Sequence, residues 1–300
     1  GSFWNKEGAA VQPARLARGL ALAVERHGGT IYEQTRVTDY VPGPLPRLDT
    51  ELGNVSAKVI VLAGEAYLSR LPKMRRRVVP ATSHIVITEP LPDAIWQEIG
   101  WGARDVLGGF GSAGGYLNHT ADGRITFGPY RGKVPFNSTI TDALDRDENV
   151  FEHGRKSALE WFPMLEGVRF THSWGGVLGI PRDHMPIMRY DRSTGIAMGY
   201  GYTGEGVATA NLSGRVLADL ITEADTDLTR LPMTTHAPVD WEPEPVRWAG
   251  YSLVRRGRYQ INEEVERTGK YPEKPSIPQR LWNMYPPRAW RSIWKMGGQD

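Results

Sequence analysis

The stretch MGYGYTGEGVATANLSGRVLADLI, residues 198–221, gives the strongest indication of the fold, because a short apolar run passes through glycines into a helical pattern. Its spacing Gly199-x-Gly201-x-x-Gly204 is the outline of a dinucleotide-binding turn. Such a turn also needs a second parallel strand that ends in an acidic residue, and ADTDLTRLPM (224–233) has no buried-strand pattern. A pyrophosphate site is therefore not predicted here.

The same turn is still a candidate site for an anion or a dipole. Its glycines let the backbone approach a ligand closely, and the first amides of the following helix carry the positive end of the helix dipole. The alternative is a glycine-rich turn that only packs tightly, and the spacing alone does not separate the two. A second match to the glycine pattern, Gly109 to Gly114, leads into a strand pattern instead of a helix, so we do not expect it to bind nucleotide.

The segments around this turn predict α/β character on both sides of a mainly antiparallel sheet. Strands are expected at 30–37, 55–63, 82–88, 124–127, 168–173 and 195–200. The apolar run at 55–63 predicts a strand covered on both faces. Helices are expected at 148–163, 206–222 and 245–268, and from Pro13 to Gly28-Gly29 with Leu16, Leu20 and Val24 on one face. This order implies two domains, the first interrupted by the second, and clefts between such domains commonly hold ligands.

Composition excludes several classes of function. The net charge is only +2 and basic residues are interleaved with acidic ones, so a nucleic-acid partner is not expected. The absence of cysteine excludes disulfides, thiolate metal sites and a cysteine nucleophile. No apolar run is long enough to cross a bilayer, so we expect no membrane partner and a cytoplasmic location. No His-Glu-x-x-His spacing is present, so no metal site is predicted.

Two blocks, SWGGVLGIPRDHMPIM (173–188) and TGIAMGYGYTGEGVATANLSGRVLADLI (194–221), resemble the C-terminal cofactor segment of the D-amino-acid-oxidase-like FAD-dependent oxidoreductases. That superfamily includes glycine, sarcosine and γ-glutamylputrescine oxidases. Shorter blocks are similar to the same group, and they are AKVIVLAGEAY (57–67), HTADGRITFGPYRG (119–132) and WEPEPVRWAG (241–250). The resemblance covers most of the chain.

The resemblance implies an architecture of α/β plus α+β type. A partial FAD-binding domain, Rossmann-like and of the glutathione-reductase type, would be interrupted by a mainly antiparallel substrate-domain sheet with helices. The expected boundaries are 1–75 and 176–235 for the remainder of the FAD-binding domain, 76–175 for the substrate domain and 236–300 for a C-terminal arm. In this superfamily an N-terminal β-α-β unit binds the pyrophosphate, and such a unit takes about 30 residues or more. We therefore expect an N-terminally incomplete chain.

The cofactor that the resemblance implies is FAD, without a tether through cysteine. The loop expected to lie against the flavin ring consists of Gly201, Tyr202, Thr203, Gly204, Glu205 and Gly206, with Val207 beginning the helix. Trp174 and Gly175 match a strand that passes near the flavin, and the backbone of Val37 matches a contact to the adenine region. Many relatives have histidine at the position of Glu205, so this carboxylate either points away from the ring or lowers the flavin potential.

The substrate contacts implied by the resemblance are Tyr116, Tyr130 and Arg131 in the inserted sheet, and Arg182. For Arg182, pairing with a substrate carboxylate and simple surface solvation remain open alternatives. Asp183 is expected to cap the turn before Pro186. No side chain stands out as a catalytic acid or base, which agrees with hydride transfer from a neutral amine.

The expected activity is that of an FAD-dependent oxidoreductase, in which hydride passes from a substrate C–N bond to the flavin. The expected partner is a small-molecule amine or amino acid. The alternative is a non-catalytic fragment, or one subunit of a split flavoenzyme that acts as a binding module. A homo-oligomer and a second chain supplying the missing FAD-binding section are both left open.

Overall fold

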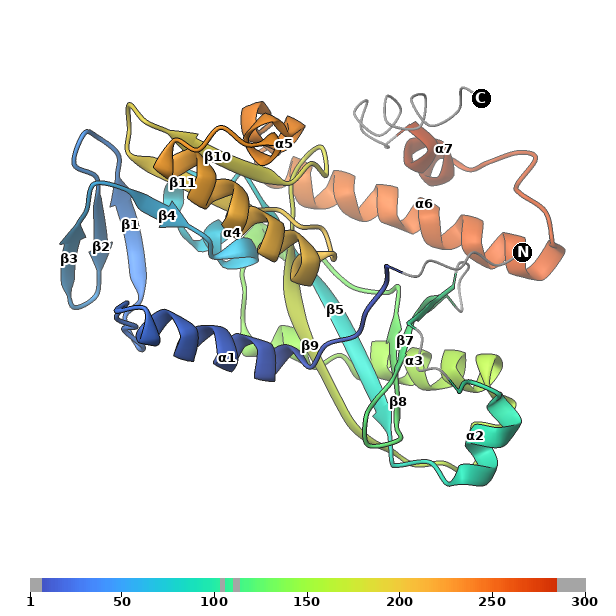
Figure 1. Ribbon diagram of the computed structural model, residues 1–300. Coiled ribbons are helices and arrows are strands. Elements are labelled where there is room, and N and C mark those ends of the chain that lie inside the picture. Colours follow the sequence, from blue (N-terminus) through green and yellow to red (C-terminus); the bar gives the residue numbers. More distant parts are fainter. Residues whose placement is uncertain (1–6, 103–105, 110–113, 285–300) are drawn as a thin grey trace.

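The computed structural model describes residues 7–102, 106–109 and 114–284 (Figure 1). Its largest sheet has five strands in the order β6-β7-β8-β5-β9, and every neighbouring pair is antiparallel. The strands are β5 (Val79–Thr88), β6 (Leu107–Gly108), β7 (Gly115–His119), β8 (Ile125–Pro129) and β9 (Phe170–Ile180). Helices α2 (Asp93–Ile99) and α3 (Glu148–Trp161) close one core around buried Phe127 and Phe151.

A second sheet has the order β10-β11-β4, in which β10 (Ile187–Asp191) is antiparallel to β11 (Ile196–Tyr200) and β11 is parallel to β4 (Ile60–Leu62). Helix α4 (Gly206–Thr222) packs on β10 and β11 and buries Val216 and Leu217. Apolar residues of the sheet form a separate core with the 3₁₀ turns that follow β4, including Leu68 and Met74. The parallel pair and its helix agree with the α/β character expected for this part of the chain.

A three-stranded antiparallel meander precedes this sheet in sequence and comprises β1 (Val37–Val41), β2 (Arg47–Thr50) and β3 (Gly53–Ser56). All four residues of β3 are exposed. Two strand predictions are therefore wrong. Residues 31–36 are not extended in a sheet and include a turn at 33–34, so of the strand predicted at 30–37 only Val37 lies in a strand, as the first residue of β1. The strand predicted at 55–63 is divided between exposed β3 and short β4, because the chain turns at residues 57–59 to leave the meander.

Helix α1 (Pro13–Arg26) forms as predicted, and the Gln12 side chain accepts a hydrogen bond from the Arg15 amide at 2.6 Å. None of its residues is buried, although its sequence is strongly amphipathic. Its apolar side chains Leu16, Leu20, Leu22 and Val24 are 40%, 58%, 56% and 48% exposed. In Figure 1, α1 lies on the left, below β4 and α4, while α2 lies at the bottom of the picture. The apolar face of α1 thus has no covering layer among the described residues.

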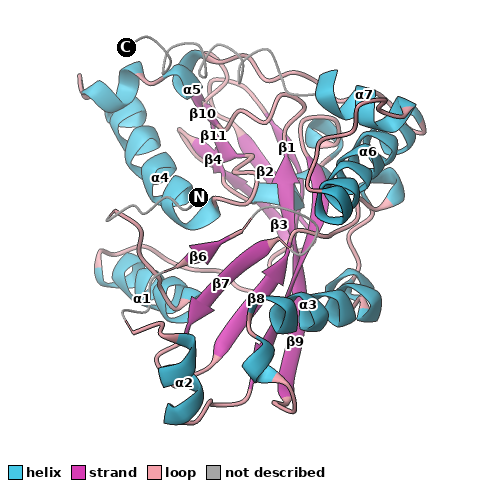
Figure 2. Ribbon diagram, turned by 90° about the vertical axis from the view of Figure 1, so that its right-hand side faces the viewer, coloured by secondary structure: helices cyan, strands magenta, loops and turns pink. Residues whose placement is uncertain are grey.

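The C-terminal segment packs back onto both sheets. It contains α5 (Pro232–Thr235), α6 (Val246–Thr268) and α7 (Ile277–Met284). Trp241 is only 2% exposed and its indole donates to the Ile180 carbonyl at 2.8 Å, while its ring meets Tyr251 edge to face. The Arg247 side chain is also buried, where it pairs with Glu244. Figure 2 shows α6 and α7 side by side on the outer surface.

The helices predicted to start at Pro13 and to span 148–163, 206–222 and 245–268 are confirmed as α1, α3, α4 and α6, and the bounds of the last three agree within two residues. Strand β9 is longer than its prediction at 168–173, because the glycine-rich segment 175–180 stays extended against β5. Among the described residues, no helix has the length and apolar character needed to cross a bilayer. Within the same residues, no group of three acidic or histidine side chains could hold a metal ion.

Candidate functional site

The loop between β11 and α4 is built on left-handed backbone. Gly201 has φ +82°, Thr203 +54° and Gly204 +107°. A Cβ atom on Gly201 would lie 2.3 Å from Cγ of Pro181, whereas one on Gly204 would meet open space. Gly201 therefore allows close packing inside the protein, and Gly204 leaves room outside it.

Glu65 fixes the base of this loop. Its carboxylate accepts hydrogen bonds from the amides of Gly201 and Tyr202, both at 3.0 Å, and from the amide of Gly179 at 2.6 Å. The Thr203 amide bonds to the Gly179 carbonyl at 3.3 Å. The turn at the end of β11 is thus anchored to the end of β9, and the amides of Gly201, Tyr202 and Thr203 are already occupied.

The start of α4 is different, because no side chain in the described part of the chain caps it. The first amides of an α-helix have no partner within the helix, and here the first closed turn is Thr209 amide to Glu205 carbonyl at 3.2 Å. Glu205 and Val207 are exposed, with Val207 at 53%. This helix end can therefore receive a negatively charged or strongly dipolar group beside open Gly204.

Tyr202 turns away from that open side. It bonds to Ser213 of α4, and burial raises the pKa of its hydroxyl. A Cβ on Gly199 would lie 2.3 Å from Ser213 Oγ and 3.1 Å from the Tyr202 hydroxyl, so these three residues pack tightly. Tyr202 therefore shapes the loop from inside.

The other predicted cofactor residues lie on separate elements. Trp174 and Gly175 pair with Ile85 and His84 across β5 and β9, and the Trp174 side chain is 43% exposed. A Cβ on Gly175 would lie 2.5 Å from the His84 ring, so glycine is required there for packing. Val37 begins β1 and packs partly buried against the core of the second sheet. Their contacts to a cofactor stay predictions.

Tyr116 and Tyr130, both predicted for the substrate face, lie together with ring centroids 6.1 Å apart. The Tyr116 hydroxyl is 3.1 Å from Ser83 Oγ, and the Arg258 guanidinium of α6 lies over the Tyr130 ring at 5.9 Å. Burial raises the pKa of the Tyr130 hydroxyl, and the charge of Glu205 raises it further while Arg258 lowers it. Tyr130 is therefore within electrostatic range of the loop that precedes α4.

The two predicted arginines are held by the C-terminal segment. Arg131 pairs with Glu263 at 3.3 Å and lies 5.3 Å from the Tyr259 ring centroid. Arg182 pairs with Glu242, with Nε 3.0 and 3.1 Å from the two carboxylate oxygens and Nη2 3.0 Å from Oε1, and its guanidinium lies 5.2 Å from the Trp241 ring centroid.

Both arginines thus link the sheets to the arm, and their substrate contacts stay predictions. The prediction for Asp183 is confirmed, since its carboxylate accepts from the Met185 amide at 3.2 Å and also meets His236 at 2.6 Å.

Sequence reasoning missed Glu65 and Arg258. The position of Glu65, directly after a glycine that ends an apolar strand, is a usable signal, because strand ends in α/β sheets commonly carry ligand-facing residues. Arg258 has no local signal, since only the fold of α6 brings it to Tyr130. The second glycine pattern, Gly109 to Gly114, mostly falls on residues 110–113, outside the described residues.

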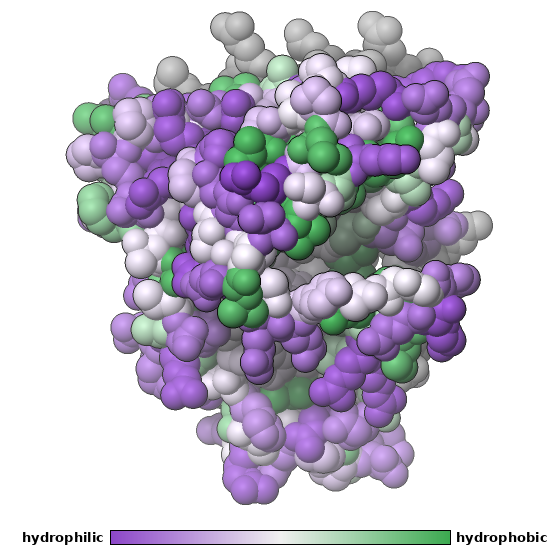
Figure 3. Space-filling model, turned by 90° about the vertical axis from the view of Figure 1, so that its left-hand side faces the viewer, coloured by the Kyte–Doolittle hydropathy of each residue, from purple (hydrophilic) through white to green (hydrophobic). Residues whose placement is uncertain are grey.

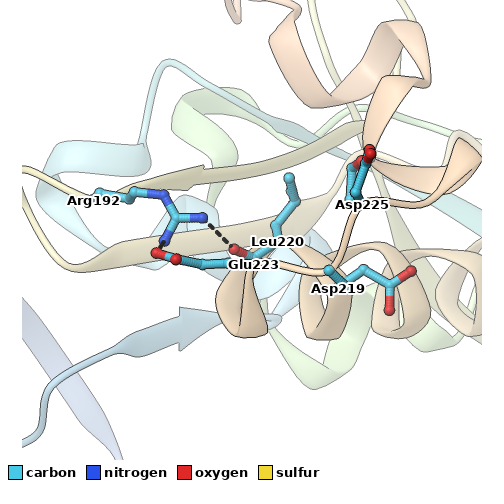
Figure 4. Close-up of a pocket in the computed structure, with 7 residues that line it drawn as sticks. Arg192, Asp219, Leu220, Glu223 and Asp225 are labelled. Atoms are coloured by element: carbon cyan, nitrogen blue, oxygen red, sulfur yellow. Dashed lines mark hydrogen bonds and ion pairs between the residues drawn. The ribbon is translucent and has the colours of Figure 1, made fainter.

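A pocket of about 440 Å³ lies at the other end of α4 (Figure 4). Its lining residues are Arg192, Asp219, Leu220, Glu223, Ala224, Asp225 and Thr229. Arg192 binds the Glu223 carboxylate and the Leu220 carbonyl, each at 2.8 Å. The first lining residue along α4, Asp219, comes 13 residues after Gly206, about 20 Å along the helix. It is therefore not part of the glycine-loop site.

Comparison with known proteins finds related sequences among flavoenzymes and other oxidoreductases. γ-Glutamylputrescine oxidoreductase of Escherichia coli (strain K12) is 29% identical over 227 residues, 74% of this chain and 50% of that protein. Glycine oxidase of Geobacillus kaustophilus (strain HTA426) is 23% identical over 228 residues, 74% of this chain and 56% of that protein. The chain thus spans about half the length of the curated relatives it matches.

Solved structures share the fold. The glycine oxidase structure from Geobacillus kaustophilus superposes with a TM-score of 0.62 at 21% identity, over 75% of this chain and 58% of that one. L-Proline dehydrogenase from P. horikoshii gives 0.61 at 20% identity, over 74% and 57%. The model of the FAD dependent oxidoreductase family DAO matches residues 1–220, which include the glycine loop and α4, and FAD is the cofactor that this match implies. This chain belongs to the DAO family of FAD-dependent oxidoreductases.

Proposed function

We propose that this chain is the part of an amine- or amino-acid-oxidising flavoenzyme that contacts the flavin ring and the substrate. The observation that carries the proposal is the uncapped start of α4 beside Gly204, whose missing side chain leaves open space. A planar, electron-accepting ring fits there, because its reduced form carries negative charge that a helix start stabilises. The residues proposed to hold the ring are Gly201 to Val207, with Trp174, Gly175 and Val37 as further contacts.

When bound, FAD supplies the redox chemistry, which is acceptance of hydride from a C–N bond. The protein contributes orientation and electrostatics. Tyr116 and Tyr130 form the proposed substrate wall, with Ser83 fixing the Tyr116 hydroxyl. Arg258 and Glu205 bring opposite charges to Tyr130. This pairing suits a zwitterion, since a guanidinium binds carboxylate and a carboxylate attracts an amine. An amino acid is therefore favoured over a simple amine.

We also propose that a β-α-β section, on the same polypeptide or on a second one, completes the FAD site next to α1 and β4. Among the residues that the structure describes, β4 pairs with a strand on one side only, which is β11, and its central residue Val61 is 47% exposed. Parallel strands are normally covered on both faces. Figure 3 shows the face that carries β1–β3 and α1 as hollowed, with hydrophobic residues in the hollow. An added parallel strand and helix would cover Val61 and the apolar face of α1.

The proposed division places the β1-β2-β3 and β10-β11-β4 sheets in 1–75 with 176–235, most of the five-stranded sheet in 76–175 and the C-terminal helices in 236–300. β5 and β9 pair from Thr88 and Phe170 to Val79 and Ile180, so the ladder continues five residues beyond the expected boundary at 175. The boundary residues therefore belong structurally to the five-stranded sheet.

A flavin spectrum tests the proposal. We expect the purified chain to retain FAD, seen as flavin absorbance after unbound FAD is removed, when it is mixed with FAD and a β-α-β FAD-binding polypeptide. Gly204→Val should abolish this gain, because φ +107° strains a branched residue and its side chain fills the open side.

Gly214→Val is the matched control, because Gly214 is exposed on α4 and also has open space around it. Equal flavin binding by both variants would remove the assignment of the loop. A chain that stays colourless in every combination would support the alternative, a non-catalytic binding module.

A further inference from the structure

The carboxylate of Glu65 occupies a pocket made of three backbone amides. Gly179 donates at the end of β9, and Gly201 and Tyr202 donate directly after β11. Glu65 itself follows β4, so one side chain joins the ends of three strands. Converging amides form a concave anion site, and here the anion belongs to the protein.

The surroundings of Glu65 are fitted to this contact. A Cβ on Gly179 would lie 2.6 Å from Glu65 Oε2 and 2.9 Å from Oε1, so only glycine leaves room for the carboxylate. The backbone of Glu65 is left-handed, with φ +47°, a conformation that a glutamate rarely adopts. Strained backbone of this kind persists where the surrounding contacts hold it, and it clusters at functional sites.

We propose that Glu65 is a positioning residue, a built-in anion that holds the Gly201–Tyr202 peptide so that the uncapped amides of α4 face the flavin. This inference rests on the proposed function. It divides the loop amides into two sets. Those of Gly201 and Tyr202 are saturated by Glu65 and those of Thr203 and Glu205 by backbone carbonyls, whereas those of Gly206 and Val207 remain for the ring. The fixed negative charge also opposes electron gain by a flavin held nearby.

If Glu65 acts through its negative charge, a neutral side chain of the same size should not replace it. In Glu65→Gln the side-chain oxygen still accepts from Gly201 and Tyr202, but the NH₂ group meets the Gly179 amide, donor against donor. In Glu65→Gly the strain at φ +47° disappears and the three amides lose their acceptor.

Anion rescue of the flavin-free chain is the first test. We expect Glu65→Gly to melt at a lower temperature than the wild type, and sodium formate to raise that temperature in a saturable manner, because formate reproduces the missing carboxylate. Sodium chloride at equal ionic strength should not do so.

Glu223→Gly is the matched control, since Glu223 also has a left-handed φ of +62° and an exposed carboxylate paired with Arg192. A similar response to formate in this control, or no response in Glu65→Gly, overturns the pocket assignment.

If Glu65→Gly does not fold, amide hydrogen exchange in Glu65→Gln takes its place. The Gly201, Tyr202 and Gly179 amides should exchange at least about tenfold faster than in the wild type, since bonds to a charged acceptor are lost or weakened. Unchanged exchange at all three amides overturns the inference.

The second readout uses the flavin-loaded form. Glu65→Gln should bind FAD more weakly and raise its reduction potential, and Glu223→Gln should change neither. Normal FAD affinity and potential in Glu65→Gln overturn the positioning role even if formate binds. A wild-type chain that never binds FAD defeats the proposed function instead, whatever formate does.

Discussion

Gly201 shows how one residue constrains the loop from two directions. Its left-handed φ of +82° disfavours any side chain, and the pyrrolidine ring of Pro181 occupies the place of a Cβ. We expect Gly201→Ala to lower the free energy of unfolding by about 2–4 kcal/mol. Chemical denaturation with urea measures this loss.

Gly214→Ala is the control for Gly201→Ala. It should stabilise the chain by about 0.5–1 kcal/mol, because Gly214 is exposed within a regular helix. Equal effects of the two substitutions would contradict the packing argument.

His184 predicts a dependence of stability on pH. Burial lowers its pKa from 6.5 to about 4, against a smaller opposing effect of Asp183. Between pH 6.5 and about 4, the unfolded chain therefore binds a proton at His184 and the folded chain does not. The contribution of His184 to the free energy of unfolding is complete above pH 6.5 and is lost as pH falls toward 4.

Replacement by asparagine, which tolerates the left-handed φ of +59° at this position, should flatten the loss of stability between pH 6.5 and 4. Thermal melts of both proteins at several pH values measure the difference. Parallel curves for wild type and His184→Asn would show that His184 does not cause the slope.

Arg258 predicts selectivity for carboxylate-bearing substrates. In the flavin-loaded form, Arg258→Met should raise KM for an amino acid by about tenfold or more, since a charge-assisted contact is lost. KM for the matching amine without a carboxylate should change little. Arg256→Met on the same helix, with an exposed side chain, is the control. Equal changes for both substrates would indicate that Arg258 only supports the Tyr130 ring.

Among the elements, α1 should affect the binding of a partner without affecting the free energy of unfolding. Leu20 is 58% exposed, so Leu20→Gln should change the free energy of unfolding by less than about 0.5 kcal/mol. The same substitution should weaken binding of the β-α-β polypeptide, because it places an amide in the proposed interface. Titration calorimetry and thermal melts measure the two effects.

Leu117→Ala provides the opposite pattern to Leu20→Gln. Leu117 is fully buried, and its truncation should cost about 2–5 kcal/mol without touching the surface of α1. Unweakened binding by Leu20→Gln would place the contact elsewhere.

The elements with strong periodicity were predictable from the sequence, and the short ones were not. α3, α4 and α6 have stripes or caps that local sequence determines, so their bounds were close. β4 has only three residues and its pairing with β11 spans more than 130 positions in sequence, which local patterns do not encode. Apolar VSAKVIVLA at 55–63 looked continuous because composition does not show where a chain changes sheet.

The site followed the same rule. Its glycine loop was predictable, because glycine spacing and the helix pattern are contiguous in sequence. The contact of Glu65 with the Gly179 amide joins residues 114 positions apart, and Arg258 reaches Tyr130 from the arm. Contacts between charged or polar groups that are far apart in the sequence cannot be predicted from local sequence patterns. The exposure of the apolar face of α1 could not be predicted either, because an amphipathic pattern predicts a buried face but not the element that covers it.

For the whole molecule, two surfaces left uncovered among the described residues, the free edge of β4 and the apolar face of α1, predict association that depends on protein concentration. Alone, the chain should self-associate through these apolar surfaces, because exposed strand edges pair readily. Addition of a β-α-β FAD-binding polypeptide should convert it to a defined complex and raise its melting temperature. Size-exclusion chromatography with light scattering distinguishes the two. A monodisperse monomer that ignores the added polypeptide would refute the docking proposal.

The long β5–β9 ladder has a mechanical consequence. β5 and β9 pair within the five-stranded sheet, and Gly179, close to one end of their ladder, donates to the carboxylate of Glu65. This hydrogen bond links the five-stranded sheet to the glycine loop, because the same carboxylate accepts from the amides of Gly201 and Tyr202. We therefore expect the position of the glycine loop to depend on the position of the five-stranded sheet.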